Sequence, residues 1–129
     1  MQDNINIALI DDHTLFRTGL KNLLDSIKGF RVVAEASNGV EFIEIVKNKE
    51  IDIALVDIAM PRMNGVKATE LALELKPSLQ IIALSMFGEE AYYNQMVEAG
   101  ARGFILKDSD IQVVEKGIKP LAPASTIWL

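Results

Sequence analysis

Five polar side chains stand directly after apolar runs of the chain, where the strands of a sheet would end: Asp11, Asp12, Asp57, Ser85 and Lys107. If the first and third runs are neighbouring strands, three carboxylates meet. Two like charges about 4 Å apart repel by roughly 4 kcal/mol at an effective dielectric near 20. A divalent cation is the simplest way to offset this repulsion. An all-carboxylate site in a chain without cysteine favours Mg²⁺ over Zn²⁺.

The same residues are suited to phosphoryl chemistry. Mg²⁺ and the ammonium of Lys107 together would hold a phosphoryl group despite the carboxylates, with Asp57 as the nucleophile that carries it. Ser85 is placed to donate a hydrogen bond to a phosphoryl oxygen. Taken singly, the residues have ordinary structural readings: Asp11 and Asp12 as caps of the next helix, and Lys107 as a partner of surface acids. Only their combination favours a site.

The elements that must position these residues follow from two kinds of apolar pattern. Short runs rich in Ile, Val and Leu alternate with longer segments of helical periodicity. This alternation predicts an α/β fold, a doubly wound five-stranded parallel sheet with helices on both faces. Ligands of such sheets bind beyond the carboxyl ends of the strands. The predicted strands are residues 5–10, 30–36, 51–56, 79–84 and 103–106.

Helices are predicted between these strands at residues 14–27, 40–49, 66–75 and 89–99. A fifth helix should start near Asp110 and end near Lys119, because Pro120 and Pro123 follow. Residues 121–129 are then an apolar, non-helical tail. The apolar side chains of the first helix are expected to be Leu15, Leu20, Leu23, Leu24 and Ile27.

Composition limits the classes of protein that remain. A chain of 129 residues with 50% hydrophobic and 24% charged residues is typical of one globular domain. The net charge of −5 disfavours binding of this chain to nucleic acid or to an anionic membrane. Because we find no cysteine, no membrane span and no signal peptide, we expect a soluble cytoplasmic protein.

Four stretches together resemble the receiver domain of two-component response regulators. They are Ile10-Asp11-Asp12-His13, Val56-Asp57-Ile58-Ala59-Met60-Pro61-Arg62-Met63-Asn64-Gly65, Leu84-Ser85 and Phe104-Ile105-Leu106-Lys107. The resemblance covers residues 5–119, and leaves 120–129 as an atypical C-terminal tail. Residues 12–20 resemble the subfamily whose receivers precede a helix-turn-helix DNA-binding domain, which we do not expect within this chain. The resemblance implies the flavodoxin-like strand order 2-1-3-4-5.

The resemblance also implies roles for the site residues. Asp57 would accept a phosphoryl group from a phosphohistidine of a sensor histidine kinase. Asp12, Asp57 and the backbone carbonyl of Ala59 would bind Mg²⁺ directly, and Asp11 would act mainly through a water. Lys107 would pair with Asp57 before transfer and with the phosphoryl group afterwards. The protein would be a phosphoacceptor that assists its own phosphorylation and dephosphorylation, and not an enzyme that acts on other substrates.

A conformational switch is the expected output of this chemistry. Ser85 would move toward the phosphoryl oxygens and Phe104 would rotate inward behind it, as a population shift between two packings. The changed surface would support a homodimer and, in the full-length protein, control of transcription. We interpret His13 as a loop residue and not a metal ligand. We expect the kinase to dock on His13, Phe16 and Arg17 as exposed residues of the first helix.

Three alternatives differ in their chemistry. A receiver-shaped interaction module would never carry a phosphoryl group, although the site residues are all present. A haloacid dehalogenase-type phosphatase needs a second Asp two residues after its nucleophile, where this chain has Ala59. A flavodoxin-like electron carrier is disfavoured, because Asp11 and Asp12 would repel its phosphate without a metal.

Overall fold

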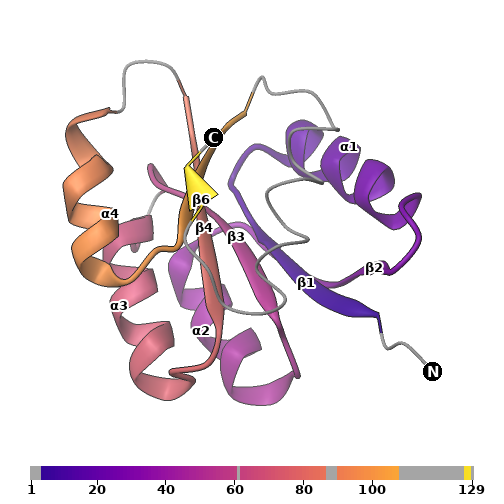
Figure 1. Ribbon diagram of the computed structural model, residues 1–129, viewed down its shortest axis with the longest axis horizontal. Helices are drawn as coiled ribbons and strands as arrows, with labels where there is room; N and C mark the ends of the chain where they lie inside the picture. The colour runs from indigo at the N-terminus through magenta and orange to yellow at the C-terminus, as the bar shows by residue number, and fades with distance from the viewer. Residues whose placement is uncertain (1–3, 61, 87–89, 108–126, 129) are drawn as a thin grey trace.

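The computed structural model describes residues 4–60, 62–86, 90–107 and 127–128 of the chain. Its strands form one parallel sheet in the order β2-β1-β3-β4-β5-β6 (Figure 1). The strands are β1 (Ile5–Ile10), β2 (Phe30–Ala36), β3 (Ile53–Asp57), β4 (Gln80–Ser85), β5 (Gly103–Leu106) and β6 (Ile127–Trp128). The first five confirm the predicted order 2-1-3-4-5.

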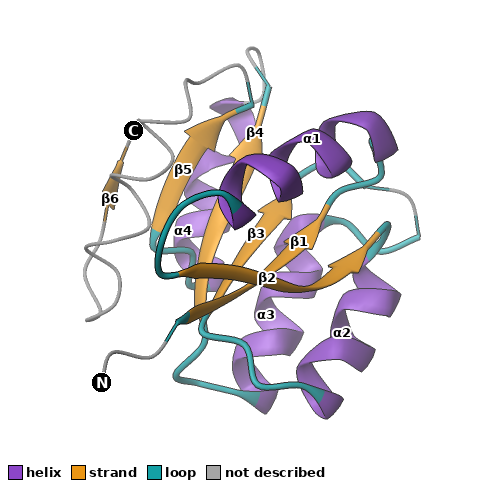
Figure 2. Cartoon of the chain, turned by 90° about the vertical axis from the view of Figure 1, so that its right-hand side faces the viewer, coloured by secondary structure: helices purple, strands orange, loops and turns teal. Residues whose placement is uncertain are grey.

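Helices cover both faces of this sheet, as the alternating pattern predicts (Figure 2). They are α1 (Thr14–Asp25), α2 (Gly39–Asn48), α3 (Gly65–Leu75), the 3₁₀ turn η1 (Glu90–Tyr92) and α4 (Tyr93–Ala99). Helix α1 lies on one face, and α2, α3 and α4 lie on the other. Asparagine side chains cap α2 and α3: Asn38 accepts from the Glu41 N–H and Asn64 from the Lys67 N–H, both at 3.0 Å.

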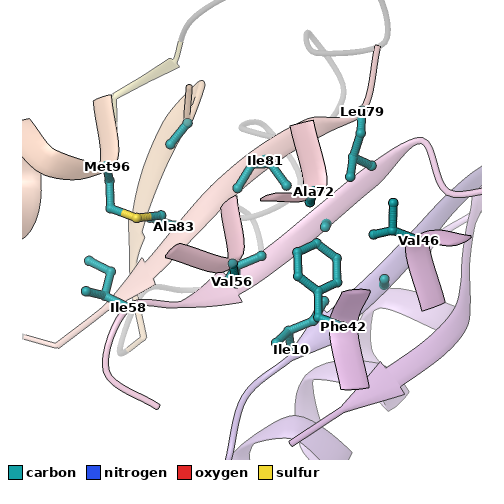
Figure 3. Close-up of a cluster of buried hydrophobic side chains, with 14 of the residues drawn as sticks. Ile10, Phe42, Val46, Val56, Ile58, Ala72, Leu79, Ile81, Ala83 and Met96 are labelled. Atoms are coloured by element: carbon teal, nitrogen blue, oxygen red, sulfur yellow. The ribbon is translucent and has the colours of Figure 1, made fainter. Parts of the chain in front are cut away.

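The core consists of two clusters, because successive strand residues point to opposite faces. In β1, Ile7 and Leu9 pack on the side of α1. Ala8 and Ile10 pack on the other side, in the cluster that surrounds Phe42 of α2 (Figure 3). Burial of both faces explains why the central strands read as continuous apolar runs.

The apolar face of α1 differs from the prediction in its phase. Phe16, Leu20 and Leu24, spaced four residues apart, face the sheet. Leu15 and Leu23 lie one position away from this stripe and are 90% and 49% exposed. The prediction was therefore wrong for Leu15 and Leu23, because a leucine-rich helix offers two apolar stripes and the sheet covers only one of them.

Other differences concern the ends of elements. Strand β3 begins at Ile53 and includes Asp57, and β4 includes Ser85, so both polar residues are the last residues of their strands. The predicted fifth helix, from Asp110 to Lys119, lies outside the described residues. The predicted non-helical tail contains the two-residue strand β6, which pairs with β5. Within the described part of the chain, no helix is long and apolar enough to span a membrane.

Candidate phosphoryl and metal site

The site lies at the carboxyl ends of β1, β3 and β5. From β1 the chain passes to β2 on one side, whereas β3, β4 and β5 follow on the other side, so the strand order reverses between β1 and β3. Asp11 directly follows β1, Asp57 ends β3, and Lys107 directly follows β5. Because parallel strands end at the same edge, this connectivity brings together residues that are nearly 100 positions apart.

Lys107 bridges two buried carboxylates. Its Nζ lies 2.8 Å from Asp11 Oδ2 and 3.2 Å from Asp57 Oδ2. Both aspartates are about 1% exposed, and the lysine side chain is 8% exposed. Within the described part of the chain, neither Oδ2 atom has a hydrogen-bond partner of acceptable geometry. The ion pairs with Lys107 therefore offset part of the cost of burying two like charges side by side.

The environment of Asp57 changes its protonation. Burial, followed by the nearby negative charge of Asp11, raises the pKa of the Asp57 carboxyl from 3.8 to about 7, and the ammonium of Lys107 only partly opposes this rise. A carboxyl group with this pKa holds a proton well into the neutral range unless more positive charge arrives. Such a perturbed group at a strand end is typical of a functional site.

Two neighbouring residues complete the acidic group. Asp12 is exposed and His13 is exposed, in contrast to Asp11. The Nδ1 atom of His13 lies 3.2 Å from Asp11 Oδ1, 3.8 Å from Asp12 Oδ1 and 2.8 Å from Lys107 Nζ. One possible ligand atom from each of Asp11, Asp12, His13 and Asp57 fits within 4.8 Å. The interpretation of His13 as a plain loop residue missed this contact, since its sequence position next to Asp12 does not reveal where the ring points.

These donor atoms fit a hard divalent cation. Carboxylate oxygens predominate, and exposed Asp12 leaves the group open to solvent. Among the described residues, two buried oxygens, Asp11 Oδ2 and Asp57 Oδ2, make no hydrogen bond of acceptable geometry and are balanced by the charge of Lys107. Mg²⁺ prefers such oxygen ligands and keeps part of its water shell. Ala59, whose carbonyl is the remaining expected ligand, lies two residues beyond β3 and is exposed.

The predicted switch residues lie on the two strands next to β3. Ser85 is buried at the end of β4, and its carbonyl accepts the N–H of Lys107 at 2.8 Å. Phe104 of β5 is buried and stacks on Tyr93 of α4, with ring centroids 4.4 Å apart and an angle of 16° between the rings. Phe104 thus occupies an inner position, and its ring is in direct contact with a helix.

The loop after β3 folds back onto the main chain of the site. The N–H of Gly65 donates to the Ile58 carbonyl at 2.8 Å. A Cβ atom on Gly65 would lie 2.4 Å from the Asp57 carbonyl oxygen and 2.9 Å from Ile58 Cα. Only glycine permits this close approach, which fixes the start of α3 directly against Asp57.

The start of α1 borders the site with an apolar surface. The ring of Phe16 lies 5.1 Å from Lys107 Nζ, within the range of a cation–π contact. A groove of about 540 Å³ is lined by His13, Leu15, Phe16, Met86 and Lys107. The expectation that Phe16 and Arg17 are exposed was wrong, because both side chains are mostly covered, whereas Leu15 is the residue that protrudes.

Comparisons with known proteins agree with this geometry. The response regulator receiver domain pattern matches residues 7–119. The transcriptional regulatory protein DegU of Brevibacillus brevis is 36% identical over 121 residues, which cover 94% of this chain and 51% of DegU. The chain spans about half the length of the curated relatives that it matches.

Two solved structures illustrate the similarity in three dimensions. A two-component response regulator of the LuxR family from Aurantimonas sp. SI85-9A1 matches with a TM-score of 0.90 and 27% identity, over 97% of this chain and 89% of that chain. A CheX–CheY–BeF₃–Mg²⁺ complex from Borrelia burgdorferi matches with a TM-score of 0.85 and 27% identity, over 93% of this chain and 90% of that chain. With the family pattern covering most of its length, the chain belongs to the response regulator receiver domains of two-component systems.

Proposed function

We propose that this receiver domain accepts a phosphoryl group on Asp57 with the help of Mg²⁺. The observation that carries the proposal is the bridge from Lys107 to the buried carboxylates of Asp11 and Asp57, beside exposed Asp12. Such a group holds a nucleophile, a fixed cation and oxygen ligands in one place. The complex of a structural neighbour with BeF₃ and Mg²⁺ further supports it.

The residues of the site have distinct roles in this proposal. Asp12, Asp57 and the Ala59 carbonyl would hold Mg²⁺ directly, and Asp11 would act through a water. Bound Mg²⁺ supplies positive charge that keeps Asp57 ionised and offsets charge on the transferred group. Lys107, which already contacts Asp57, is positioned to pair with a phosphoryl oxygen once the carboxylate has reacted.

The transfer step is a displacement at phosphorus. An oxygen of the ionised Asp57 carboxylate forms the new O–P bond while the N–P bond of a kinase phosphohistidine breaks. The imidazole leaves with the electron pair, and the product is an acyl phosphate on Asp57. Ser85, at the end of the adjacent strand, would donate its hydroxyl hydrogen to a phosphoryl oxygen.

The switch follows from the positions of Ser85 and Phe104. Phe104 lies in the interior and is stacked on Tyr93. The fold therefore accommodates Phe104 in the inner position, and phosphorylation would raise the population of that packing. Any shift of Phe104 changes the packing of Tyr93, so the signal would reach the surface of α4. We propose a homodimer and transcriptional control in the longer protein as the output.

The sensor kinase that supplies the phosphoryl group would dock beside the site. The groove between α1 and Lys107 is mostly apolar, and Leu15 protrudes from its border. A helix of a kinase placed there would bring its phosphohistidine close to Asp57. We place this exchange in the cytoplasm. The chain would be a phosphoacceptor that assists its own reactions and not an enzyme with turnover on other substrates.

Intact-protein mass tests the phosphoacceptor directly. The chain and its Asp57→Asn variant are incubated with acetyl phosphate, with and without Mg²⁺. We expect one phosphoryl adduct on the chain that requires Mg²⁺ and is absent from the variant. Circular dichroism of both proteins controls for folding.

This experiment, together with an assay of phosphate release from a phosphoester, separates the alternatives. No adduct on folded protein would contradict the proposal and favour the phosphate-independent interaction module. Continued release of phosphate from a phosphoester over many cycles would indicate a haloacid dehalogenase-type phosphatase. That outcome is disfavoured, because Ala59 has no acidic group to protonate a leaving group.

A further inference from the structure

Arg17 of α1 reaches the main chain next to the acidic site. Its Nη1 donates to the Asp11 carbonyl oxygen at 2.5 Å and to the Ala36 carbonyl oxygen at 3.4 Å. Its Nε donates to Glu35 Oε1 at 3.1 Å. The arginine side chain is only 16% exposed, and its two contacts with main-chain carbonyls are partly buried. One guanidinium thus joins α1, β2 and the residue that directly follows β1.

The two carbonyls belong to a single hydrogen-bonded unit. The N–H of Asp11 donates to the Ala36 carbonyl at 3.0 Å, which is the last rung between β1 and β2. Arg17 donates to the same Ala36 oxygen and to the carbonyl of Asp11 itself. The peptide groups of Asp11 are therefore held from both ends, by Ala36 and by Arg17.

The side chain of Asp11 depends on this main-chain position. Asp11 Oδ1 accepts the N–H of His13 at 2.8 Å, and Oδ2 lies 2.8 Å from Lys107 Nζ. A short side chain can satisfy both contacts only if its Cα is held in place. Without Arg17, the Asp11 carbonyl would lose its charged donor, and the turn from Asp11 to His13 would gain freedom next to the carboxylates.

We propose that Arg17 is a positioning residue that fixes Asp11, and through it the carboxylates that bind Mg²⁺. This inference rests on the proposed function, and it assigns Arg17 to the site and not to the kinase surface. A purely structural role would predict a loss of stability without a change in Mg²⁺ affinity. A planar guanidinium with several donors suits the task, because it can contact two carbonyls and a carboxylate together.

The test measures Mg²⁺ binding to the unphosphorylated chain, so that it does not depend on phosphoryl transfer. Mg²⁺ is titrated into ¹⁵N-labelled protein, and the amide shifts give the dissociation constant. We expect Arg17→Met, which keeps an apolar stem, to weaken Mg²⁺ binding by about tenfold, a change typical of losing a group that orients a metal ligand. Arg17→Lys should lie in between, because an ammonium cannot reach all three acceptors.

Glu35→Gln is the matched control. It touches Nε of the same guanidinium but not the main chain of Asp11, so its Mg²⁺ affinity should stay within about twofold of the starting protein. An unchanged Mg²⁺ affinity in folded Arg17→Met would overturn the inference. If Arg17→Met does not fold, Arg17→Lys decides in the same way. Failure of the starting chain to bind Mg²⁺ at all would instead contradict the proposed function.

Discussion

At the scale of single residues, burial disfavours the negative charge of the Asp57 carboxylate. Its carboxyl is buried next to Asp11, and its pKa is raised to about 7, mainly by burial. In the unfolded chain the group has an ordinary pKa of 3.8. The folded state therefore binds more protons than the unfolded state between about pH 4 and pH 7, so this group's contribution to stability falls as the pH rises through that window.

Replacement of Asp57 by Asn should remove this pH dependence. In metal-free buffer, we expect Asp57→Asn to be more stable than the starting protein at pH 8, with a gap that shrinks toward pH 4. The gap should be a few kcal/mol at most, since one pKa unit corresponds to about 1.4 kcal/mol. Urea unfolding at several pH values measures it. A gap that stays constant with pH would show that Asp57 titrates normally in the folded protein.

At the scale of elements, the loop between β3 and α3 packs closely against the site because Gly65 has no side chain. The position of a Cβ on Gly65 falls 2.4 Å from the Asp57 carbonyl oxygen. The atoms that it would meet belong to the backbone of Asp57 and Ile58, so they cannot turn aside as a flexible side chain would. The loop and the strand end must move together.

A pair of glycine variants tests this fit. Gly65→Ala should destabilise the protein by roughly 1–3 kcal/mol, a range typical of overpacking, and should slow adduct formation with acetyl phosphate. Gly19→Ala is the control. Gly19 is exposed in the middle of α1, and apart from the backbone of its own helix and its chain neighbours, no described atom lies within 4 Å of its Cβ position. Alanine there should stabilise the helix by roughly 0.5–1 kcal/mol and leave the adduct unchanged. Equal stability of Gly65→Ala and the starting protein would contradict the tight fit.

At the scale of the whole molecule, the acidic site and the apolar groove lie side by side at one edge of the sheet. Leu15, which is 90% exposed, borders the groove next to Lys107. We expect Leu15→Ala to slow phosphoryl transfer from the cognate sensor kinase several-fold, because an exposed apolar anchor at an interface is lost. Leu23→Ala, on the same helix and 49% exposed, lies outside the groove residues and should leave transfer unchanged.

Acetyl phosphate distinguishes a defect in kinase docking from a defect in phosphoryl transfer in these two leucine variants. Both should form the adduct with acetyl phosphate as fast as the starting protein, because a small donor needs no docking surface. Slow adduct formation by Leu15→Ala with acetyl phosphate would place the defect in the site itself. Equal transfer from the kinase to both variants would move the docking surface elsewhere.

The sheet and the strand-end residues could be predicted because their signals are local. An apolar run followed by Asp57 or Lys107 is visible in the sequence, and the α/β alternation supplies the geometry that joins them. The contacts of α1 were not predictable in the same way. Whether Leu15 or Phe16 faces the sheet depends on the rotation of a leucine-rich helix about its axis. The hydrogen bond from Arg17 to the Ala36 carbonyl joins α1 to β2, and the sequence gives no local signal for such a contact.

The bridge made by Lys107 has a consequence for how the site is loaded. The ammonium is tethered to the fold, so it competes for Asp11 and Asp57 at an effective concentration that dilution does not change. In the proposed function, a divalent ion would therefore enter by exchange, and its apparent affinity would be lowered by the fraction of molecules in which the lysine already occupies the carboxylates. In the proposed reaction, the displaced ammonium of Lys107 becomes available to the incoming phosphoryl oxygen. The group that competes with the divalent ion before the reaction would therefore pair with the acyl phosphate after it.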